Sequence, residues 1–195
     1  MKEIPEELQN WTEAISAYTP MEWERLPELD LYMDQVITLM DKLLSPFSHD
    51  GDRLLTSSMI NNYVKDGVLP RPEAKKYSRD HLARLFMICM LKSVLSLPEI
   101  NTILQGMTSE QGVDELYQNF IALQSQINQE TASRIEAQKE TDDNQLYQLA
   151  MTMALEANAR RIAAAHILES LTPGDIKEAK EKDKEKKKKD KEQNA

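Results

Sequence analysis

Two serines and two asparagines stand at helical spacing in one short segment, and cations follow them closely. The four polar residues are Ser57, Ser58, Asn61 and Asn62. The cations that follow are Lys65, Arg71, Lys75, Lys76 and Arg79. Asparagine can pair with two atoms of an adenine edge, serine can donate to or accept from several bases, and Lys and Arg bind phosphates. The pattern is typical of a helix that enters the DNA major groove, and equally of a capped amphipathic helix with a solvated face.

This segment is a basic island in an acidic chain. The formal net charge of the whole chain is -9, yet residues 53–92 hold eight Lys and Arg against three Asp and Glu. The flanking segments, residues 1–52 and 93–171, carry net charges of -9 and -7. Such an island is the electrostatic footprint expected for a polyanionic partner. Charge alone does not separate that interpretation from an ordinary solvated helix face.

Catalytic and metal chemistry has little support in the sequence. Adjacent His49 and Asp50 resemble a metal-binding pair, but only His81 and His166 remain to complete such a site, so we interpret the pair as a loop turn. Cys89 falls on an apolar helix face, which favours a buried structural thiol over a nucleophile. No glycine-rich phosphate loop and no Ser/His/Asp arrangement occurs. We therefore expect no enzyme, no cofactor and no metal site.

The composition predicts the all-α class. The chain has 195 residues with only five Gly, and it is rich in residues that favour helices. A single Cys excludes an internal disulfide and is typical of a reducing compartment, so we expect a cytoplasmic protein. No apolar run is long enough to predict a membrane span.

The first half of the chain shows helices with clear start and stop signals. Asp30 and Ser78 are the expected N-caps of two of them, and one residue of the Thr56–Ser58 run is the N-cap of another. Gly67 is placed as a left-handed C-cap, and prolines at 70 and 72 predict extended backbone before the next helix. Ser96 with Glu99 three residues later is a capping box. The expected helices span residues 6–18, 31–44, 59–66, 79–95 and 97–106.

The second half predicts two longer helices, over residues 113–135 and 142–171. Helices of this length with an apolar stripe need a partner surface, which is either the first domain or a second chain. The last residues are rich in Lys and Glu and are expected to be a disordered charged tail. The expected organisation is a helical DNA-binding domain with an N-terminal extension over 1–110, a helical hairpin or dimerisation region over 113–171, and the tail over 172–195.

The run MINNYVKDGVLP at residues 59–70, with KKYS at 75–78 and SLPEI at 96–100, resembles the winged helix-turn-helix of MerR-type transcription regulators. That family pairs a recognition helix that ends in a Gly-Leu-Leu-Pro-like turn with a small wing. The resemblance implies that Ser57, Asn61 and Asn62 face bases and that Lys75 and Lys76 lie on the wing. Asn61 stands where the family usually has an arginine.

A longer stretch, residues 20–105, resembles a bacterial family defined by the domain of unknown function numbered 1836. The segments that carry this resemblance are LPELDLYMDQ at residues 26–35 and residues 55–77. Its members look like small MerR-related regulators, so the resemblance implies the same fold without supplying a chemistry.

These observations lead us to expect a sequence-specific transcription regulator that binds double-stranded DNA as a homodimer joined through residues 113–171. The alternative is an all-helical protein–protein interaction adaptor that binds no DNA. Salt-dependent, sequence-selective DNA binding that requires Lys75 and Lys76 distinguishes the two. Metal sensing through thiolates is not expected, because no cysteine follows Cys89, and the sequence predicts no particular small-molecule effector.

Overall fold

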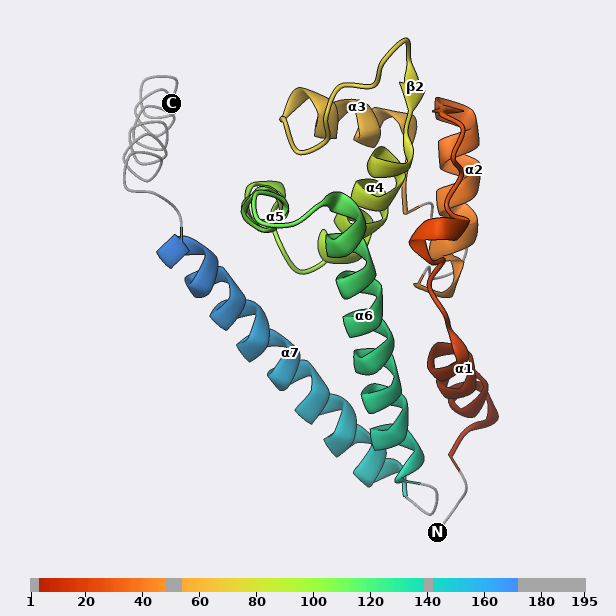
Figure 1. Cartoon of the computed structure of the whole chain (residues 1–195). Helices are drawn as coiled ribbons and strands as arrows, with labels where there is room; N and C mark the ends of the chain where they lie inside the picture. The colour runs from red at the N-terminus through yellow and green to blue at the C-terminus, as the bar shows by residue number, and fades with distance from the viewer. Residues whose placement is uncertain (1–3, 48–53, 139–141, 172–195) are drawn as a thin grey trace, which may run out of the picture.

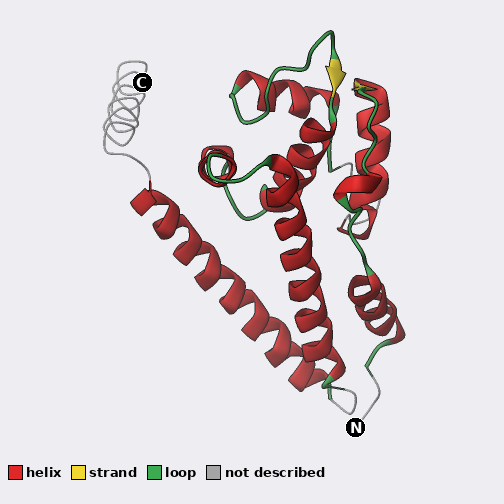
Figure 2. Ribbon diagram, in the orientation of Figure 1, coloured by secondary structure: helices red, strands yellow, loops and turns green. Residues whose placement is uncertain are grey.

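Helices make up nearly all of the regular structure (Figures 1 and 2). The computed structural model describes residues 4–47, 54–138 and 142–171, so the expected tail lies outside the described residues. The expected all-α class is confirmed, and none of the described helices is long and apolar enough to cross a membrane. The elements in chain order are α1 (Glu6–Ala17), η1 (Trp23–Arg25), β1 (Leu31–Tyr32), α2 (Met33–Leu44), η2 (Ser45–Phe47), α3 (Ser57–Lys65), β2 (Lys76–Tyr77), α4 (Arg79–Leu91), α5 (Leu97–Thr108), α6 (Val113–Glu136) and α7 (Asp143–Leu171).

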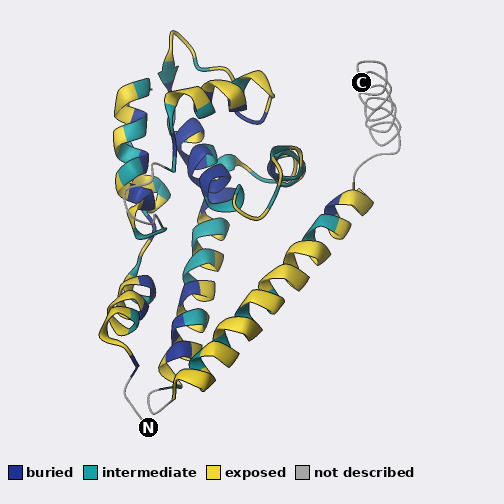
Figure 3. Cartoon of the chain, turned by 180° about the vertical axis from the view of Figure 1, so that it is seen from behind, coloured by how far each residue is buried: buried dark blue, intermediate teal, exposed yellow. Residues whose placement is uncertain are grey.

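The central element is α4, which lies inside the other helices. Eight of its thirteen residues are buried, and Leu82, Phe86 and Ile88 have no exposed surface. A helix that is apolar on most sides must be enclosed by others. Helices α2, α5 and α6 pack against it, and the shared core, dark blue in Figure 3, also includes Met40 of α2 and Ile60 of α3.

Helix α2 begins two residues later than the sequence predicts. Asp30 is not its N-cap; Tyr32 is, and the Tyr32 N–H donates to the Gln35 side-chain oxygen at 2.9 Å. Leu31 and Tyr32 instead form β1, which pairs antiparallel with β2, with Leu31 opposite Tyr77. Strand pairing requires extended backbone, so the helix starts only after the pairing ends.

Helix α4 ends at Leu91, whereas apolar spacing predicts an end near Leu95. The N–H groups of Val94 and Leu95 both donate to the Leu91 carbonyl, at 3.0 and 2.9 Å. The Lys92 amine donates to the carbonyl of Leu54 and so ties this turn to the segment before α3. The spacing of apolar residues does not reveal such a contact, which is why the predicted helix extends too far.

The other predicted caps are confirmed. Thr56 is the N-cap of α3, and its hydroxyl oxygen accepts a backbone N–H at 3.3 Å. Gly67 has a φ of +73°, the left-handed conformation that glycine adopts without steric cost after a helix. Ser96 and Glu99 form the capping box that opens α5. Helix α3 therefore begins and ends on local signals, although it starts two residues before the predicted range.

Helix α6 extends from the core to the far end of the molecule, where α1 lies beside it (Figure 1). Thr12 and Ile15 of α1 and Ala132 and Ile135 of α6 are buried where the two helices meet. The N-terminal segment is thus attached along the length of α6 and not only to the central core.

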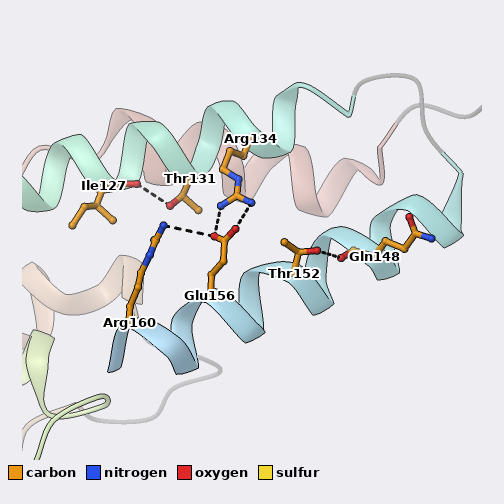
Figure 4. A network of polar contacts seen from close by, with 7 residues as sticks. All are labelled: Ile127, Thr131, Arg134, Gln148, Thr152, Glu156 and Arg160. Carbon is orange, nitrogen blue, oxygen red and sulfur yellow. Dashed lines mark hydrogen bonds and ion pairs between the residues drawn. The ribbon is translucent and has the colours of Figure 1, made fainter. Parts of the chain in front are cut away.

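Helix α7 turns back from the end of α6, diverges from it, and is the least covered helix (Figures 1 and 3). Of its 29 residues only Leu168 is buried. Arg134 of α6 donates to the two carboxylate oxygens of Glu156 at 2.6 and 3.1 Å, and Arg160 lies 3.7 Å from the same carboxylate (Figure 4). Exposed ion pairs contribute little to stability. Apart from them, α7 packs against α5, where it buries only Leu168, so α7 is weakly held by its own chain.

The buried hydroxyl of Tyr117 gives a test of how the N-terminal segment is attached. It donates to the Met21 carbonyl at 2.8 Å. Tyr117→Phe removes this donor, and we expect the free energy of unfolding to fall by about 1–2 kcal/mol, measured by urea denaturation. Tyr147→Phe, at a side chain that is 75% exposed, is the matched control and should change nothing. Equal effects of the two substitutions would contradict this role.

Candidate nucleic-acid interface

Helix α3 presents an apolar face to the core. Ile60 and Tyr63 are buried, and Met59 and Val64 beside them are half-buried. Burial raises the pKa of Tyr63 to about 12, so its phenol is neutral near pH 7. Because these side chains recur every three or four residues, their burial sets the rotation of α3 about its axis and decides which residues point outward.

The five α3 residues predicted to contact DNA lie together on the opposite face. They are Ser57, Ser58, Asn61, Asn62 and Lys65, and all are exposed. Residues spaced one turn apart fall on one side of a helix. Within the described part of the chain, no hydrogen bond or ion pair engages any of these five side chains. The structure therefore brings them together as an open polar surface.

The chain leaves α3 through a loop whose base is anchored. The N–H groups of Val68 and Leu69 both donate to the Tyr63 carbonyl, at 2.9 and 3.0 Å, and both side chains are buried. Arg71, the next predicted contact residue, is exposed two residues beyond this anchor. The anchor keeps Arg71 close to the C-terminal end of α3. Figure 1 shows the loop running from this end of α3 to β2.

A tight turn at the tip of this loop holds Lys75 in a strained conformation. Ala74 and Lys75 have φ values of 47° and 63°, in the left-handed region that residues other than glycine and asparagine rarely adopt. The Lys76 N–H donates to the Glu73 carbonyl at 2.8 Å, and these two residues form an antiparallel bridge. Such turns favour Gly and Asn. The run Glu-Ala-Lys-Lys contains neither, so no local signal predicts the turn.

Two of the predicted contact residues are engaged within the chain. The Lys76 ammonium lies 5.3 Å from the centroid of the Tyr32 ring. The Arg79 guanidinium lies 5.5 Å from the Trp23 ring centroid and 3.4 Å from a Glu28 carboxylate oxygen, and its side chain is only 20% exposed. Lys75 is exposed, so it differs from both.

Sequence reasoning misses the neighbours of Arg79. Trp23 and Glu28 lie more than fifty residues earlier in the chain, outside the basic island. No periodicity or motif connects residues that are this far apart. Only the packing of η1 against α6 brings Trp23 near Tyr117 and to the start of α4.

His81 is a buried capping residue at the start of α4. Its Nδ1 accepts the Ser78 N–H at 3.2 Å and lies 2.8 Å from the Ser78 hydroxyl, and its ring stands edge-on to Tyr77. Burial lowers the pKa of His81 and outweighs the backbone of Pro70 and the carboxylate of Asp80, which favour the protonated ring. The ring is therefore neutral at neutral pH, with Nδ1 as the acceptor in the capping box.

The other reactive groups do not form a site with these residues. Burial raises the pKa of Cys89 to about 11, so it is a protonated thiol in the core. The pair His49 and Asp50 lies outside the described residues. Across residues 4–47, 54–138 and 142–171, no three His, Cys, Asp or Glu side chains gather so as to hold a metal ion.

A shallow hollow of about 440 Å³ lies between residues 19–24 and α6. Two carboxylates make part of its wall acidic. Its lining residues are Thr19, Pro20, Glu22, Glu24, Gln118, Ile121, Ala122 and Ser125. None of them belongs to the predicted DNA-contacting set, so the hollow and the exposed face of α3 are separate features.

Comparison with known proteins shows the family of the chain but no activity. Residues 21–120 match the model of a family described as Domain of unknown function (DUF1836), and the chain belongs to this family. The match runs from the segment before η1 into α6 and so contains α3, the strained turn and α4. Neither curated proteins nor solved structures give a match. The expected DUF1836 membership is confirmed, and none of these comparisons supports the MerR-type resemblance.

Glycine at either left-handed position should relieve the strain in the turn. We expect Ala74→Gly and Lys75→Gly each to raise the free energy of unfolding by about 0.5–1 kcal/mol, because a left-handed non-glycine residue costs about 1–2 kcal/mol and the flexibility of glycine in the unfolded chain offsets part of the gain. Urea denaturation measures the change. Ala150→Gly, at an exposed helical position, is the control and should lose about 1 kcal/mol. If all three variants lose stability, the turn at Ala74 and Lys75 is not strained.

His81 should make stability depend on pH. Burial holds its pKa below the ordinary 6.5, so the unfolded chain binds a proton first as the pH falls. Stability is then complete above about pH 6.5 and declines below it. His81→Gln keeps a neutral side chain at this capping-box position and should flatten the decline, followed as melting temperature between about pH 7.5 and about pH 5. His166→Gln, at an exposed histidine, is the control and should leave this decline unchanged. If the decline persists in His81→Gln, His81 is not its cause.

Proposed function

We propose that this member of the DUF1836 family is a sequence-specific transcription regulator that reads double-stranded DNA with α3. The observation that carries the proposal is the exposed face of α3, where Asn61 and Asn62 stand beside Ser57 and Ser58. Side-chain amides and hydroxyls are the groups that read base edges in the major groove, and asparagine does so by pairing with adenine through two hydrogen bonds.

The composition of α3 favours a binding face over a merely solvated one. Serine and asparagine supply four of its nine residues, and both types lower helix stability. Glu, Lys or Gln would solvate an exposed face without that cost. The helix persists because Ile60 and Tyr63 are buried in the core, so the outward residues are free to serve recognition.

The loop between α3 and α4 supplies phosphate contacts in this proposal. Lys65 and Arg71 flank the end of α3, and Lys75 projects from the strained turn. A cation held on a rigid turn loses less conformational freedom on binding than one on a mobile loop. In a MerR-type arrangement this segment takes the place of the wing, and Tyr77 pairs with Leu31 at its base.

In the proposed interface, Lys76 and Arg79 supply charge and also help to position the base of the loop. Their contacts with Tyr32 and Trp23 hold the two cations at the base of the loop, where β2 leads into α4. Lys76 over the Tyr32 ring keeps its charge and can still attract a phosphate, whereas the charge of Arg79 is shared with Glu28 and contributes mainly to the local potential. The cationic edge then runs from the end of α3 to the start of α4.

The regulator would act as a homodimer in the cytoplasm. Operators with two-fold symmetry require two copies of α3, joined here through residues 113–171. The acidic remainder of the chain, which brings the net charge to -9, opposes binding to random DNA. Binding then depends on the local interface and not on overall charge.

Selection from a random duplex pool tests the proposal, at about 50 mM and about 200 mM salt. We expect the wild-type chain to enrich a palindromic site. Asn61→Ala with Asn62→Ala should relax base preference by about 1–3 kcal/mol for each lost contact. Lys75→Ala should weaken binding to all sequences and lower the slope of log affinity against log salt by about one unit.

Two controls separate recognition from charge and from turn geometry. Lys42→Ala removes an exposed cation from α2 and should leave the enriched site and the salt slope unchanged. Ala74→Gly alters the turn beside Lys75 without removing a charge and should retain binding. Absence of enrichment at either salt would refute DNA reading and leave the all-helical interaction adaptor as the better description.

A further inference from the structure

The outward side of α7 carries an apolar stripe that the described chain leaves uncovered. Tyr147, Met151, Leu155 and Ile162 are 75%, 61%, 64% and 42% exposed. Figure 3 shows this helix as exposed along almost its whole length. Single exposed apolar residues are common, but several aligned on one helix mark an interaction surface.

This stripe is distinct from the side of α7 that faces its own chain. Leu146, Leu149, Met153 and Ala164 are half-buried, and Leu168 is buried. At 100° per residue, these inward residues lie about 150° round the helix from the stripe. The outer stripe is therefore a second apolar face, and the packing of α7 on its own chain leaves Tyr147, Met151, Leu155 and Ile162 exposed.

The spacing of the outer face is that of a two-stranded coiled-coil seam. Its positions are Met151, Leu155, Asn158, Ile162 and Ala165, which alternate by four and three residues. The first four are exposed, and Ala165 at the end of the seam is half-buried. No charged residue occurs between positions 144 and 155, although 29% of the whole chain is charged. A long uncharged stretch on an exposed helix fits an apolar helical partner.

The seam is close to palindromic about Asn158. Leu155 and Ile162 lie three and four residues from it, and Met151 and Ala165 each lie seven residues from it. An antiparallel copy of the same helix therefore sets Leu155 against Ile162 and large Met151 against small Ala165. A surface that complements itself when reversed is the requirement for an interface related by a two-fold axis.

We propose that a second copy of this chain docks on the outer face of α7, with the two α7 helices antiparallel and Asn158 of each copy at the two-fold axis. The inference rests on the homodimer of the proposed function and names its surface and register, but it does not require DNA binding. Two asparagine amides that meet in an apolar seam bond to each other and specify one register over its slipped alternatives.

The length of α7 suits a modest dimer. A helix of 29 residues is about 44 Å long, and a strip about 10 Å wide on each of two copies buries on the order of 900 Å². That area is close to the roughly 1,000 Å² that a specific interface needs. We therefore expect a reversible dimer with a dissociation constant on the order of micromolar.

Sedimentation of the full chain, from about 1 µM to about 300 µM, tests the docking. Wild type should shift with concentration from 22.4 kDa to twice that mass. Leu155→Glu should weaken the dimer at least about 100-fold, because it places a charge in the seam. Ile167→Glu is the matched control: Ile167 is 59% exposed on the same helix but outside the seam, so the dimer should persist.

Disulfide trapping tests the register and does not depend on how well Leu155→Glu folds. Leu155→Cys and Ile162→Cys chains of different tag length, mixed and oxidised, should form the mixed disulfide in preference to either self-linked pair. Native Cys89 is buried and does not compete. A parallel pairing would give the self-linked pairs instead and would overturn the antiparallel arrangement.

Each remaining outcome decides between the proposals. A chain that stays at 22.4 kDa at every concentration, or a dimer that Leu155→Glu leaves intact, overturns the docking on α7. A dimer disrupted by Leu155→Glu, in a chain that enriches no DNA site, keeps this inference and ends the proposed function. A monomer that enriches a site overturns this inference and the homodimer of the proposed function, and it keeps only the reading of DNA by α3.

Discussion

The enclosure of α4 is the constraint on which the rest of the structure depends. Leu82, Phe86 and Ile88 of this helix have no exposed surface, so it is stable only with other helices on most of its sides. Helices α2, α5 and α6 meet that requirement, and α3 joins the same core through Ile60. The start of α4 must also be satisfied inside the fold, and His81 does this as an uncharged capping partner of Ser78.

The candidate interface is built on that enclosed scaffold. The inward side chains of α3 leave its serines and asparagines facing outward, and the buried Val68 and Leu69 anchor the loop that follows. The loop then adopts a left-handed turn at Ala74 and Lys75 that its own residue types do not favour. Strained backbone on a rigid support is frequent at functional sites, because the surrounding fold holds a conformation that the isolated segment would leave.

The molecule divides into a well-packed part and a sparsely covered one. The DUF1836 match covers residues 21–120 and coincides with the enclosed core and the candidate interface. Helix α7 lies beyond that match and contributes one buried residue, Leu168. Most helices in proteins depend on tertiary packing for stability. This dependence gives the uncovered face of α7 its significance, since packing against its own chain engages only the opposite side.

The sequence by itself determined the all-α class, the existence of the α-helices α1 to α7 and the outward polar face of α3. These features follow from local signals, such as Thr56 before α3, Gly67 after it and the Ser96–Glu99 box, because caps and periodicity act within a few residues. Only the tertiary structure decided the later start of α2, where β1 pairs with a strand more than forty residues away. It alone also decided the left-handed turn and the placing of Arg79 against Trp23, since each depends on contacts that no local pattern encodes. A local pattern reports which side of an element is apolar, and which distant residues cover that side depends on how the whole chain packs.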